Sequence, residues 1–160
     1  MTVTVERAKC DEATYKEVMD ACLPALTEYA VAPVNMKKTM EQGYRVLEQG
    51  MSFLAREETG AVVGVIGMSI SDFWYSDEPI LLNTVGPYVR PDQRFGVVGV
   101  RLMRAVRDLA DEKDMLAFVW VMDTKRKRTT QASLFATVAG YVSVGHVIAM
   151  RRHREAVAAG

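Results

Sequence analysis

The segment that decides the fold is Val89-Arg-Pro-Asp-Gln-Arg-Phe-Gly-Val-Val-Gly-Val-Arg-Leu-Met103. It predicts a strand that ends near Val89, a turn that contains glycine, and an amphipathic helix. Such a turn presents successive backbone N–H groups, and the positive end of the helix dipole, to one point in space. This cradle suits a pyrophosphate, and Arg94 adds a charge that can pair with phosphate. By itself the pattern also fits a strand–turn–helix unit whose glycines serve packing.

Downstream of this segment, residues 99–113 form a predicted helix with an apolar stripe that faces a core. The stripe contains Leu102, Met103, Val106, Leu109 and Ala110, while Arg101, Arg104, Arg107 and Asp108 lie outside it. Residues 116–122 are predicted as a buried strand and residues 128–139 as a helix with Gly140 as its C-cap. Residues 141–152 are predicted as strand, bent at Gly145, and residues from 155 onward as a frayed tail.

Upstream, residues 2–8 alternate like a strand with Val3 and Val5 on one face. A helix is predicted to start near Asp11, where Thr14 and Glu17 have the spacing of a capping box. Pro24 interrupts the pattern and Pro33 marks a second break, so two shorter helices are expected. Asn35 is the predicted N-cap of the second helix, and Gly50 is its predicted stop.

Three strands are expected between the second helix and the deciding segment. Residues 51–56 and 61–70 are predicted to form a hairpin, with the second strand buried on both faces. Residues 72–79 are expected to be a loop that carries Trp74 and Tyr75. Residues 80–89 form the next strand, in which Gly86-Pro87 predicts a bulge or a loss of pairing. The chain thus predicts an α/β fold with a sheet of mixed direction.

The composition excludes several classes of function. With 20 basic and 20 acidic residues the net charge is zero, so no global field attracts nucleic acid or an anionic membrane. There is no N-terminal signal pattern, and no apolar run reaches the roughly 18 residues of a membrane span. Cys10 and Cys22 lack metal-ligand spacing and are expected to be buried free thiols. A cytoplasmic, reduced protein without a metal is the expectation.

The deciding segment resembles the acyl-CoA-binding motif of the GNAT superfamily, in which a strand ending in Val-x-Pro precedes Arg-x-x-Gly-x-Gly/Ala. Val89 and Pro91 match the strand end, Arg94 matches the basic residue, and Gly99 matches the final small position. One position departs, because Val97 stands where the family has its middle glycine. The cradle survives this change if the dihedral angles of residue 97 suit a β-branched side chain.

A second match lies at Leu134-Phe-Ala-Thr-Val-Ala-Gly-Tyr141, which resembles the family's Leu-Tyr-x-x-x-Gly-Phe signature. The resemblance, which covers nearly the whole chain, implies a single GNAT-like domain over residues 1–152 followed by a tail at 153–160. It implies a mixed, mostly antiparallel central sheet of about six to seven strands flanked by about four helices. Family members hold acetyl-CoA in an opening between their fourth and fifth strands, where the pantetheine arm pairs like an extra strand.

The resemblance implies a donor site and leaves the catalytic residues open. The residues implied in acyl-CoA binding are Tyr88, Val89, Arg94, Phe95, Gly96, Val97, Val98, Gly99, Val100 and Arg128. The family's tyrosine acid aligns with Phe135, which cannot donate a proton; Tyr141 and Tyr88 are substitutes, although Tyr141 also fits a core aromatic. The family's glutamate base aligns with Asn83, which could only orient a water. Glu78 and His146 are further alternatives.

Other features support more than one interpretation. The run Lys125-Arg-Lys-Arg128 is a solvated loop or a contact with CoA phosphates or an acidic substrate. Trp74 and Tyr75 fit an acceptor pocket, a dimer contact or core packing alike.

Two main hypotheses follow from the resemblance. The first is an N-acyltransferase, most simply dependent on acetyl-CoA, that acts on an amine of a small molecule or protein; a homodimer is left open. The second is a GNAT-fold module that binds CoA or a protein partner with little or no catalysis. A third, a small α/β protein unrelated to acyl transfer, requires two accidental motif matches.

Overall fold

The computed structural model describes residues 2–29, 33–73, 75–94, 96–121 and 140–141 of the chain. The elements, in chain order, are β1 (Val3–Arg7), α1 (Glu12–Tyr29), α2 (Met36–Glu48), β2 (Ser52–Glu57), β3 (Val62–Phe73), β4 (Ser76–Val89), the 3-10 turn η1 (Pro91–Gln93), α3 (Val97–Lys113) and β5 (Leu116–Phe118). The strands form one sheet in the order β1-β2-β3-β4-β5. The first four pair antiparallel and β5 pairs parallel with β4, which confirms the predicted mixed, mostly antiparallel sheet.

The number of elements is confirmed only in part. The described residues contain five strands and three α-helices, in the predicted order. The expected helix at 128–139, most of the strand at 141–152 and the tail at 153–160 lie outside the described residues. The expected totals of six to seven strands and four helices therefore stay predictions. None of the described helices has the length and apolarity that a membrane span requires.

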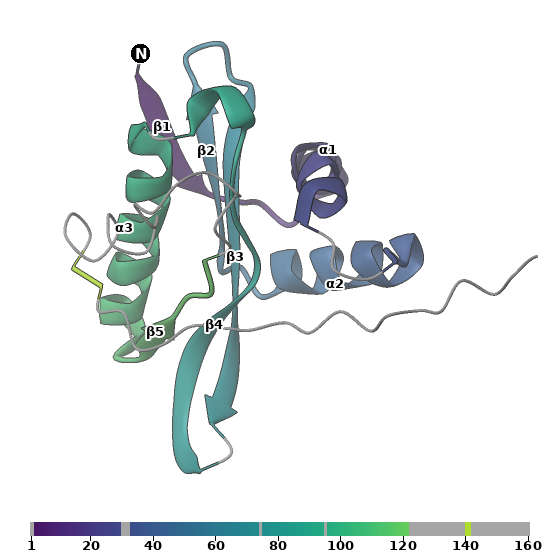
Figure 1. The fold of residues 1–160 in the computed structure, drawn as a ribbon. Coiled ribbons are helices and arrows are strands. Elements are labelled where there is room, and N and C mark those ends of the chain that lie inside the picture. Colours follow the sequence, from purple (N-terminus) through teal and green to yellow (C-terminus); the bar gives the residue numbers. More distant parts are fainter. Residues whose placement is uncertain (1, 30–32, 74, 95, 122–139, 142–160) are drawn as a thin grey trace, which may run out of the picture.

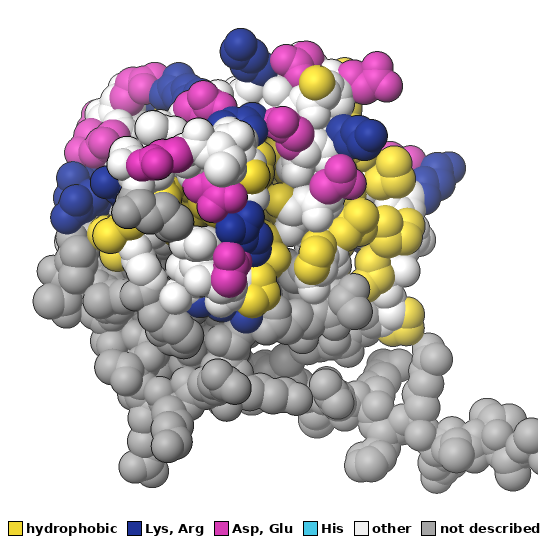
Figure 2. Space-filling model, turned by 90° about the horizontal axis from the view of Figure 1, so that it is seen from above, with side chains coloured by type: hydrophobic (Ala, Val, Ile, Leu, Met, Phe, Trp, Pro, Cys, Tyr) yellow, Lys and Arg dark blue, Asp and Glu magenta, His cyan; other side chains and the backbone are white. Residues whose placement is uncertain are grey.

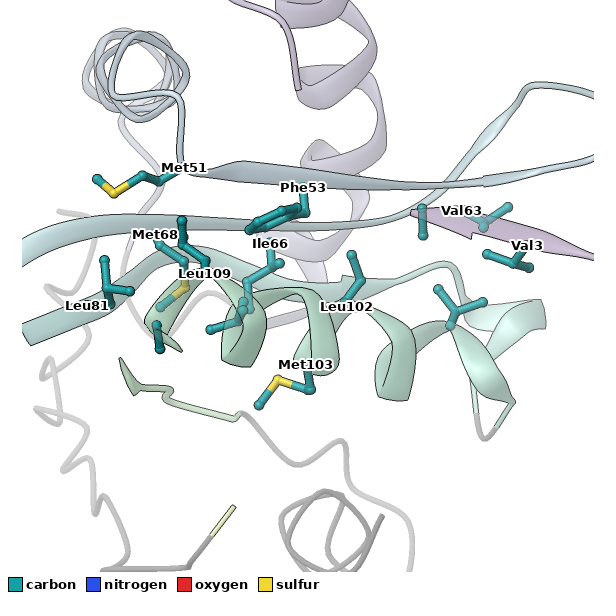
Figure 3. Packing of buried hydrophobic residues seen from close by; sticks show 14 residues of the cluster. Val3, Met51, Phe53, Val63, Ile66, Met68, Leu81, Leu102, Met103 and Leu109 are labelled. Carbon is teal, nitrogen blue, oxygen red and sulfur yellow. The ribbon is translucent and has the colours of Figure 1, made fainter. Parts of the chain in front are cut away.

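The sheet separates two layers of helix (Figure 1). Helix α3 covers one face, and α1 and α2 lie on the other. Figure 3 shows the larger core cluster, in which side chains of β1, β2, β3 and β4 meet the apolar stripe of α3. As the helical period predicts, Leu102, Met103, Val106, Leu109 and Ala110 of α3 are all buried. A smaller cluster under α1 and α2 contains Ala8, Val18, Cys22, Leu47, Leu54 and Val65.

Helix α3 lies very close to the sheet at Gly64. A Cβ added to Gly64 would be 2.8 Å from Cγ1 of Val98, 3.0 Å from Cδ1 of Leu102 and 3.1 Å from the carbonyl oxygen of Tyr88. All three neighbours are buried. The absence of a side chain at position 64 therefore sets how near the first turns of α3 come to β3 and to the end of β4.

The structure of α1 and α2 confirms one prediction about these helices and corrects two. Asn35 caps α2, because its Oδ1 accepts from the Lys38 N–H at 3.0 Å. The capping box at Thr14 is wrong, since the Thr14 N–H itself donates to Oδ1 of Asp11 at 2.7 Å. Pro24 does not interrupt the first helix but lies within α1. Proline leaves one carbonyl without its helical partner, and Pro24 is exposed, so water can take that place.

Two predictions about the strands are wrong in detail. The expected loop at 72–79 is a tight hairpin, because β3 continues to Phe73 and β4 starts at Ser76. The expected buried strand at 116–122 is three residues long, and Leu116 at its start is 62% exposed. Side chains alternate across a strand, so Ala117 packs against the core cluster while Leu116 points away from it.

The two thiols differ in exposure. Cys22 is buried in the cluster under α1, as expected, whereas Cys10 is exposed, so the sequence prediction for Cys10 is wrong. Cys10 lies just before α1 in the connection from β1, where the chain crosses the surface. Burial raises the pKa of the Cys22 thiol to about 12, because a thiolate there would lose its solvation.

Replacement of Gly64 by Ala is expected to destabilise the fold by about 1–3 kcal/mol, because the new methyl overlaps Val98 and the Tyr88 carbonyl. Urea denaturation measures the change in the free energy of unfolding. Thr4→Ala, at an exposed position of β1, is the control. A Gly64→Ala variant as stable as the Thr4→Ala variant would contradict the close contact.

Stability is expected to fall as pH rises from about 9 to about 12. The unfolded thiol ionises from its ordinary pKa of 9.0, whereas folded Cys22 stays protonated to about 12, so the unfolded state loses its proton first. Below the unfolded pKa the thiol is neutral in both states, so the contribution of buried Cys22 to the free energy of unfolding is fully present. Denaturant titrations across this pH range should show a shallower decline for Cys22→Ala than for Cys10→Ala. Equal slopes in the two variants would show that Cys22 is not held neutral.

Candidate functional site

Strand β4 changes its course before the deciding segment begins. Its pairing with β3 runs from Met68↔Asn83 to Gly67↔Val85 and then to Val65↔Tyr88, so two extra residues enter β4 within a few positions. Extra residues on one strand bend it and increase its twist. The predicted bulge at Gly86-Pro87 is thereby confirmed. Gly86 has a φ of 73°, and a Cβ there would lie 2.4 Å from the Val65 carbonyl oxygen, so only glycine fits this bend.

The end of β4 is tied to the turn that follows it. Arg90 N–H donates to the Val63 carbonyl at 2.9 Å, which directs the backbone groups of residue 90 toward β3. Successive residues alternate, so the N–H and C=O of Val89 point to the other edge of β4. There Nε of Arg94 donates to the Val89 carbonyl oxygen at 3.0 Å. Arg94 is therefore folded back onto the strand end, as part of the turn rather than as a free arm.

The N-terminus of α3 has the features of an anion site. Gly96 is the N-cap and Val97 is the first helical residue, two positions earlier than predicted. Gly96 provides no side-chain cap, and the first turn of the helix contains no acidic residue. The free N–H groups of a first turn carry the positive end of the helix dipole. Because Val98 and Gly99 are buried, they offer backbone groups rather than side chains to a ligand.

Val97 does not fill the cradle with its side chain. It has helical geometry, and Asp114 is the one non-glycine residue with positive φ in the described parts of the chain. Its side chain is 50% exposed and so points substantially to solvent. The departure from the family glycine therefore costs no backbone strain. Val100, one turn further, packs in part against the core cluster.

Arg90, which precedes this turn, pairs with two carboxylates. Arg90 donates to Glu57 at 3.2 Å through Nη2 and to Asp92 at 2.7 Å through Nε. The hydrogen bond from Arg90 is the main cause that lowers the pKa of Asp92. Figure 2 views the molecule from this end and shows acidic and basic side chains interspersed. Pairing by Arg90 reduces the repulsion that these carboxylates would exert on an anion bound nearby.

Strands β4 and β5 separate beside Asn83. Their ladder has three pairs and ends at Leu82↔Phe118. Beyond it, the Asn83 side chain takes the place of a peptide: Trp120 N–H donates to Oδ1 at 2.6 Å, and Nδ2 donates to the Trp120 carbonyl at 3.1 Å. Nδ2 also donates to the carbonyl of Gly86. The buried amide, 8% exposed, thus bridges the two diverging strands and the bulge.

Tyr141 has a structural partner. Its hydroxyl donates to the Met103 carbonyl of α3 at 2.9 Å, and its ring packs against the core cluster. Desolvation by burial is the main cause that raises the pKa of Tyr141 to about 12. The hydrogen bond to Met103 and the burial of the ring favour the core interpretation of Tyr141 over that of a general acid.

The other residues named from the sequence fall into three groups. Tyr88 is buried and pairs with Val65, so its ring lies on the α1 side of the sheet. Glu78 is exposed on β4 near the hairpin. Phe95, Arg128, Phe135, His146 and Trp74, with the run 125–128, lie outside the described residues.

The arrangement brings the N-terminus of α3, the Arg94 side chain and the separation of β4 from β5 to the same end of β4. We call this separation of the two strands the opening. Among the described residues, no three His, Cys, Asp or Glu side chains are placed to hold a metal ion. Two contacts were not foreseen from the sequence, namely the amide bridge of Asn83 and the fold-back of Arg94. Both depend on which backbone groups a bulged strand leaves unpaired, and no local sequence pattern specifies that.

Comparison with solved structures identifies the fold. The chain matches an aminoglycoside acetyltransferase from an uncultured soil metagenomic sample in complex with sisomicin, with a TM-score of 0.63 and 18% identity over 92% of this chain and 93% of that one. A predicted acetyltransferase from Clostridium acetobutylicum with acetyl-CoA matches at a TM-score of 0.67 and 11% identity, over 93% and 96%. Ribosomal-protein-alanine N-acetyltransferase from Brucella melitensis matches at 0.65 and 13%, over 94% and 99%.

These matches extend over nearly the whole length of each neighbour. The chain therefore has the fold of the GNAT acetyltransferases, as the resemblance implied. At this level of identity the likeness establishes the fold alone. No family model matches the sequence, and no curated protein does either.

Replacement of Asn83 by Asp is expected to cost about 1–3 kcal/mol at pH 8, because a carboxylate cannot donate to the Trp120 and Gly86 carbonyls. The loss should be smaller at pH 5, where a protonated carboxyl regains one donor. Urea denaturation at both pH values measures it, with exposed Thr84→Val as the neighbouring control. If Asn83→Asp and Thr84→Val unfold alike at pH 8, the amide does not hold the strands.

Proposed function

We propose that this protein is an N-acyltransferase that binds an acyl-coenzyme A, most simply acetyl-CoA, at the N-terminus of α3 and passes the acyl group to an amine. One observation carries the proposal. The uncapped, acid-free first turn of α3 and the separation of β4 from residues 119–121 both lie beside the last residues of β4. The fold is that of acetyltransferases, and one neighbour is a predicted acetyltransferase solved with acetyl-CoA.

The donor would use both features of the site. Its pyrophosphate would accept hydrogen bonds from the N–H groups of residues 97–99, with Arg94 beside them. The pantetheine arm would lie along the edge of β4 left open by the bend. There the N–H of Val89 points away from β3 and can pair with an amide carbonyl, as an added strand does.

The reaction then needs few groups from the protein. A neutral amine attacks the thioester carbonyl carbon, a C–N bond forms, and a tetrahedral oxyanion results. The oxyanion collapses, the C–S bond breaks, the thiolate leaves, and the nitrogen loses its extra proton. Holding both reactants in line contributes up to about 7–11 kcal/mol to such reactions. Water can carry the protons where no side chain is positioned to do so.

Asn83 and Tyr141, the two catalytic candidates, fit a positioning role better than proton transfer. The Asn83 amide donates hydrogen bonds to two backbone carbonyls, and the Tyr141 hydroxyl donates a hydrogen bond to the Met103 carbonyl. Asn83 would serve the reaction by holding the strands apart at the opening. Because these contacts are structural, they are also compatible with the second hypothesis, a module that binds CoA without catalysis.

Arg94→Ala is expected to weaken acetyl-CoA binding by about tenfold or more, since charge-assisted hydrogen bonds to phosphate are worth about 1.5–3 kcal/mol. Thermal melting with increasing acetyl-CoA measures the affinity, because bound ligand raises the melting temperature. Arg101→Ala, exposed on the same helix, is the matched control.

The same titration decides between the hypotheses. An unchanged melting temperature at millimolar acetyl-CoA would reject both the enzyme and the CoA-binding module. A shift in melting temperature without thioester cleavage across a panel of amines would favour the module. Equal affinity of Arg94→Ala and Arg101→Ala would mean that the phosphate cradle lies elsewhere.

A further inference from the structure

Four aromatic rings form a continuous row from the β3–β4 hairpin to the separation of β4 and β5. The rings of Phe73 and Tyr75 stack with centroids 5.2 Å apart, and Phe73 meets Phe118 edge to face at 5.5 Å. Phe118 in turn meets Trp120 at 5.5 Å with an interplanar angle of 67°. We call these four residues the aromatic row.

The row lies on the sheet face away from α3 at its β5 end. Ala117, Val119 and Val121 pack against the core cluster of α3, so alternation turns Phe118 and Trp120 to the opposite face. The row is also accessible, since Tyr75 is 66% exposed and Trp120 is 47% exposed. Figure 1 shows the β3–β4 hairpin extending past the other strands, which gives the row its open end.

One end of the row meets the opening directly. The backbone of Trp120 is the group that the Asn83 amide holds through two hydrogen bonds, at the point where β4 and β5 part. A ligand that covers the Trp120 ring would therefore lie next to the opening. It would approach from the face opposite α3, whereas the phosphate cradle belongs to α3.

The two chain segments that contain the row carry charge of a single sign. Residues 69–89 and 115–121, which contain the row, include Asp72, Asp77 and Glu78 and no Lys, Arg or His. All three carboxylates are exposed on the hairpin. Elsewhere basic residues outnumber the acidic ones by three, because the whole chain is neutral. Aromatic faces and nearby carboxylates both attract a cation, and the rings also bury an apolar body.

We propose that the aromatic row binds the acceptor as a cationic amine with an aromatic or broad apolar body. The proposal rests on the proposed function and names the class of its acceptor. The rings would take the apolar body, and the carboxylates would attract the ammonium form before it loses its proton and attacks the thioester. A second copy of this chain fits less well, because a two-fold contact would set the three carboxylates of one copy against those of the other.

Binding can be measured without catalysis. The chain has two tryptophans, so Trp74→Phe leaves Trp120 as the sole fluorophore. Phenethylamine should quench Trp120 saturably. Two control compounds should each bind at least tenfold more weakly than phenethylamine. Phenylacetate has the same ring and a negative charge, and butylamine has the positive charge and no ring. Equal binding of phenethylamine and phenylacetate, or no saturable quenching by phenethylamine, would overturn the proposal.

Variants test the two parts of the row separately. Phe118→Leu should weaken phenethylamine binding at least fivefold, and the double change Asp77→Asn with Glu78→Gln should weaken it by a similar factor. Asp111→Asn removes an exposed carboxylate from α3, away from the row, and should leave binding unchanged. An effect of Asp111→Asn as large as that of the hairpin double change would mean that only net charge matters, against the proposal.

Turnover and donor binding separate this proposal from the proposed function. With acetyl-CoA, Phe118→Leu should raise the KM for phenethylamine at least fivefold and leave the KM for acetyl-CoA unchanged; a matching rise in both would overturn a specific acceptor role. If acetyl-CoA fails to shift wild-type melting, the proposed function fails, while phenethylamine quenching still tests the row as a binding surface. Sedimentation that shows self-association lost in Phe118→Leu would overturn the proposal in favour of a dimer contact.

Discussion

The position of the phosphate cradle relative to β4 depends on how closely α3 lies on the sheet at Gly64. With no side chain at that position, Val98 and Leu102 reach the backbone of β3, and the carbonyl of Tyr88 lies beside them. This contact places the first turn of α3 next to the last residues of β4. A helix N-terminus attracts an anion only within about its first turn, so an outward shift of α3 would separate the cradle from the strand edge beside it.

A second constraint acts on the other edge of β4. Two extra residues bend the strand, and the bend would leave the backbone of Trp120 without a partner. The Asn83 amide satisfies both groups of Trp120 and a carbonyl of the bulge. Buried polar groups without partners are costly, so this amide makes the separation of two neighbouring strands compatible with a stable sheet. The opening is therefore built into the hydrogen bonding and does not require a ligand to create it.

These constraints suggest how such a fold can tolerate change at its usual catalytic positions. Attack of an amine on a thioester depends strongly on alignment, and alignment here would come from α3, β4 and the Asn83 bridge rather than from a dedicated acid or base. The neighbours include an aminoglycoside acetyltransferase and a ribosomal-protein-alanine N-acetyltransferase, at 18% and 13% identity. Under the proposed function, a scaffold of this kind would leave the acceptor to be chosen by surfaces such as the aromatic row.

The sequence by itself determined the features that depend on short-range order. Local periodicity and turn chemistry predicted five of these features: the apolar stripe of α3, the Asn35 cap, the hairpin of β2 and β3, the bulge at Gly86-Pro87 and the glycine-containing turn after Val89. It failed at two positions near the start of α1. Asp11 rather than Thr14 caps α1, and Cys10 is exposed although Cys22 is buried. Only the tertiary structure decided that Asn83 bridges two strands, that Arg94 folds onto Val89, and that Phe73 meets Phe118. The physical reason is that each of these contacts is fixed by strand register and bend, which the whole sheet sets and no local pattern encodes.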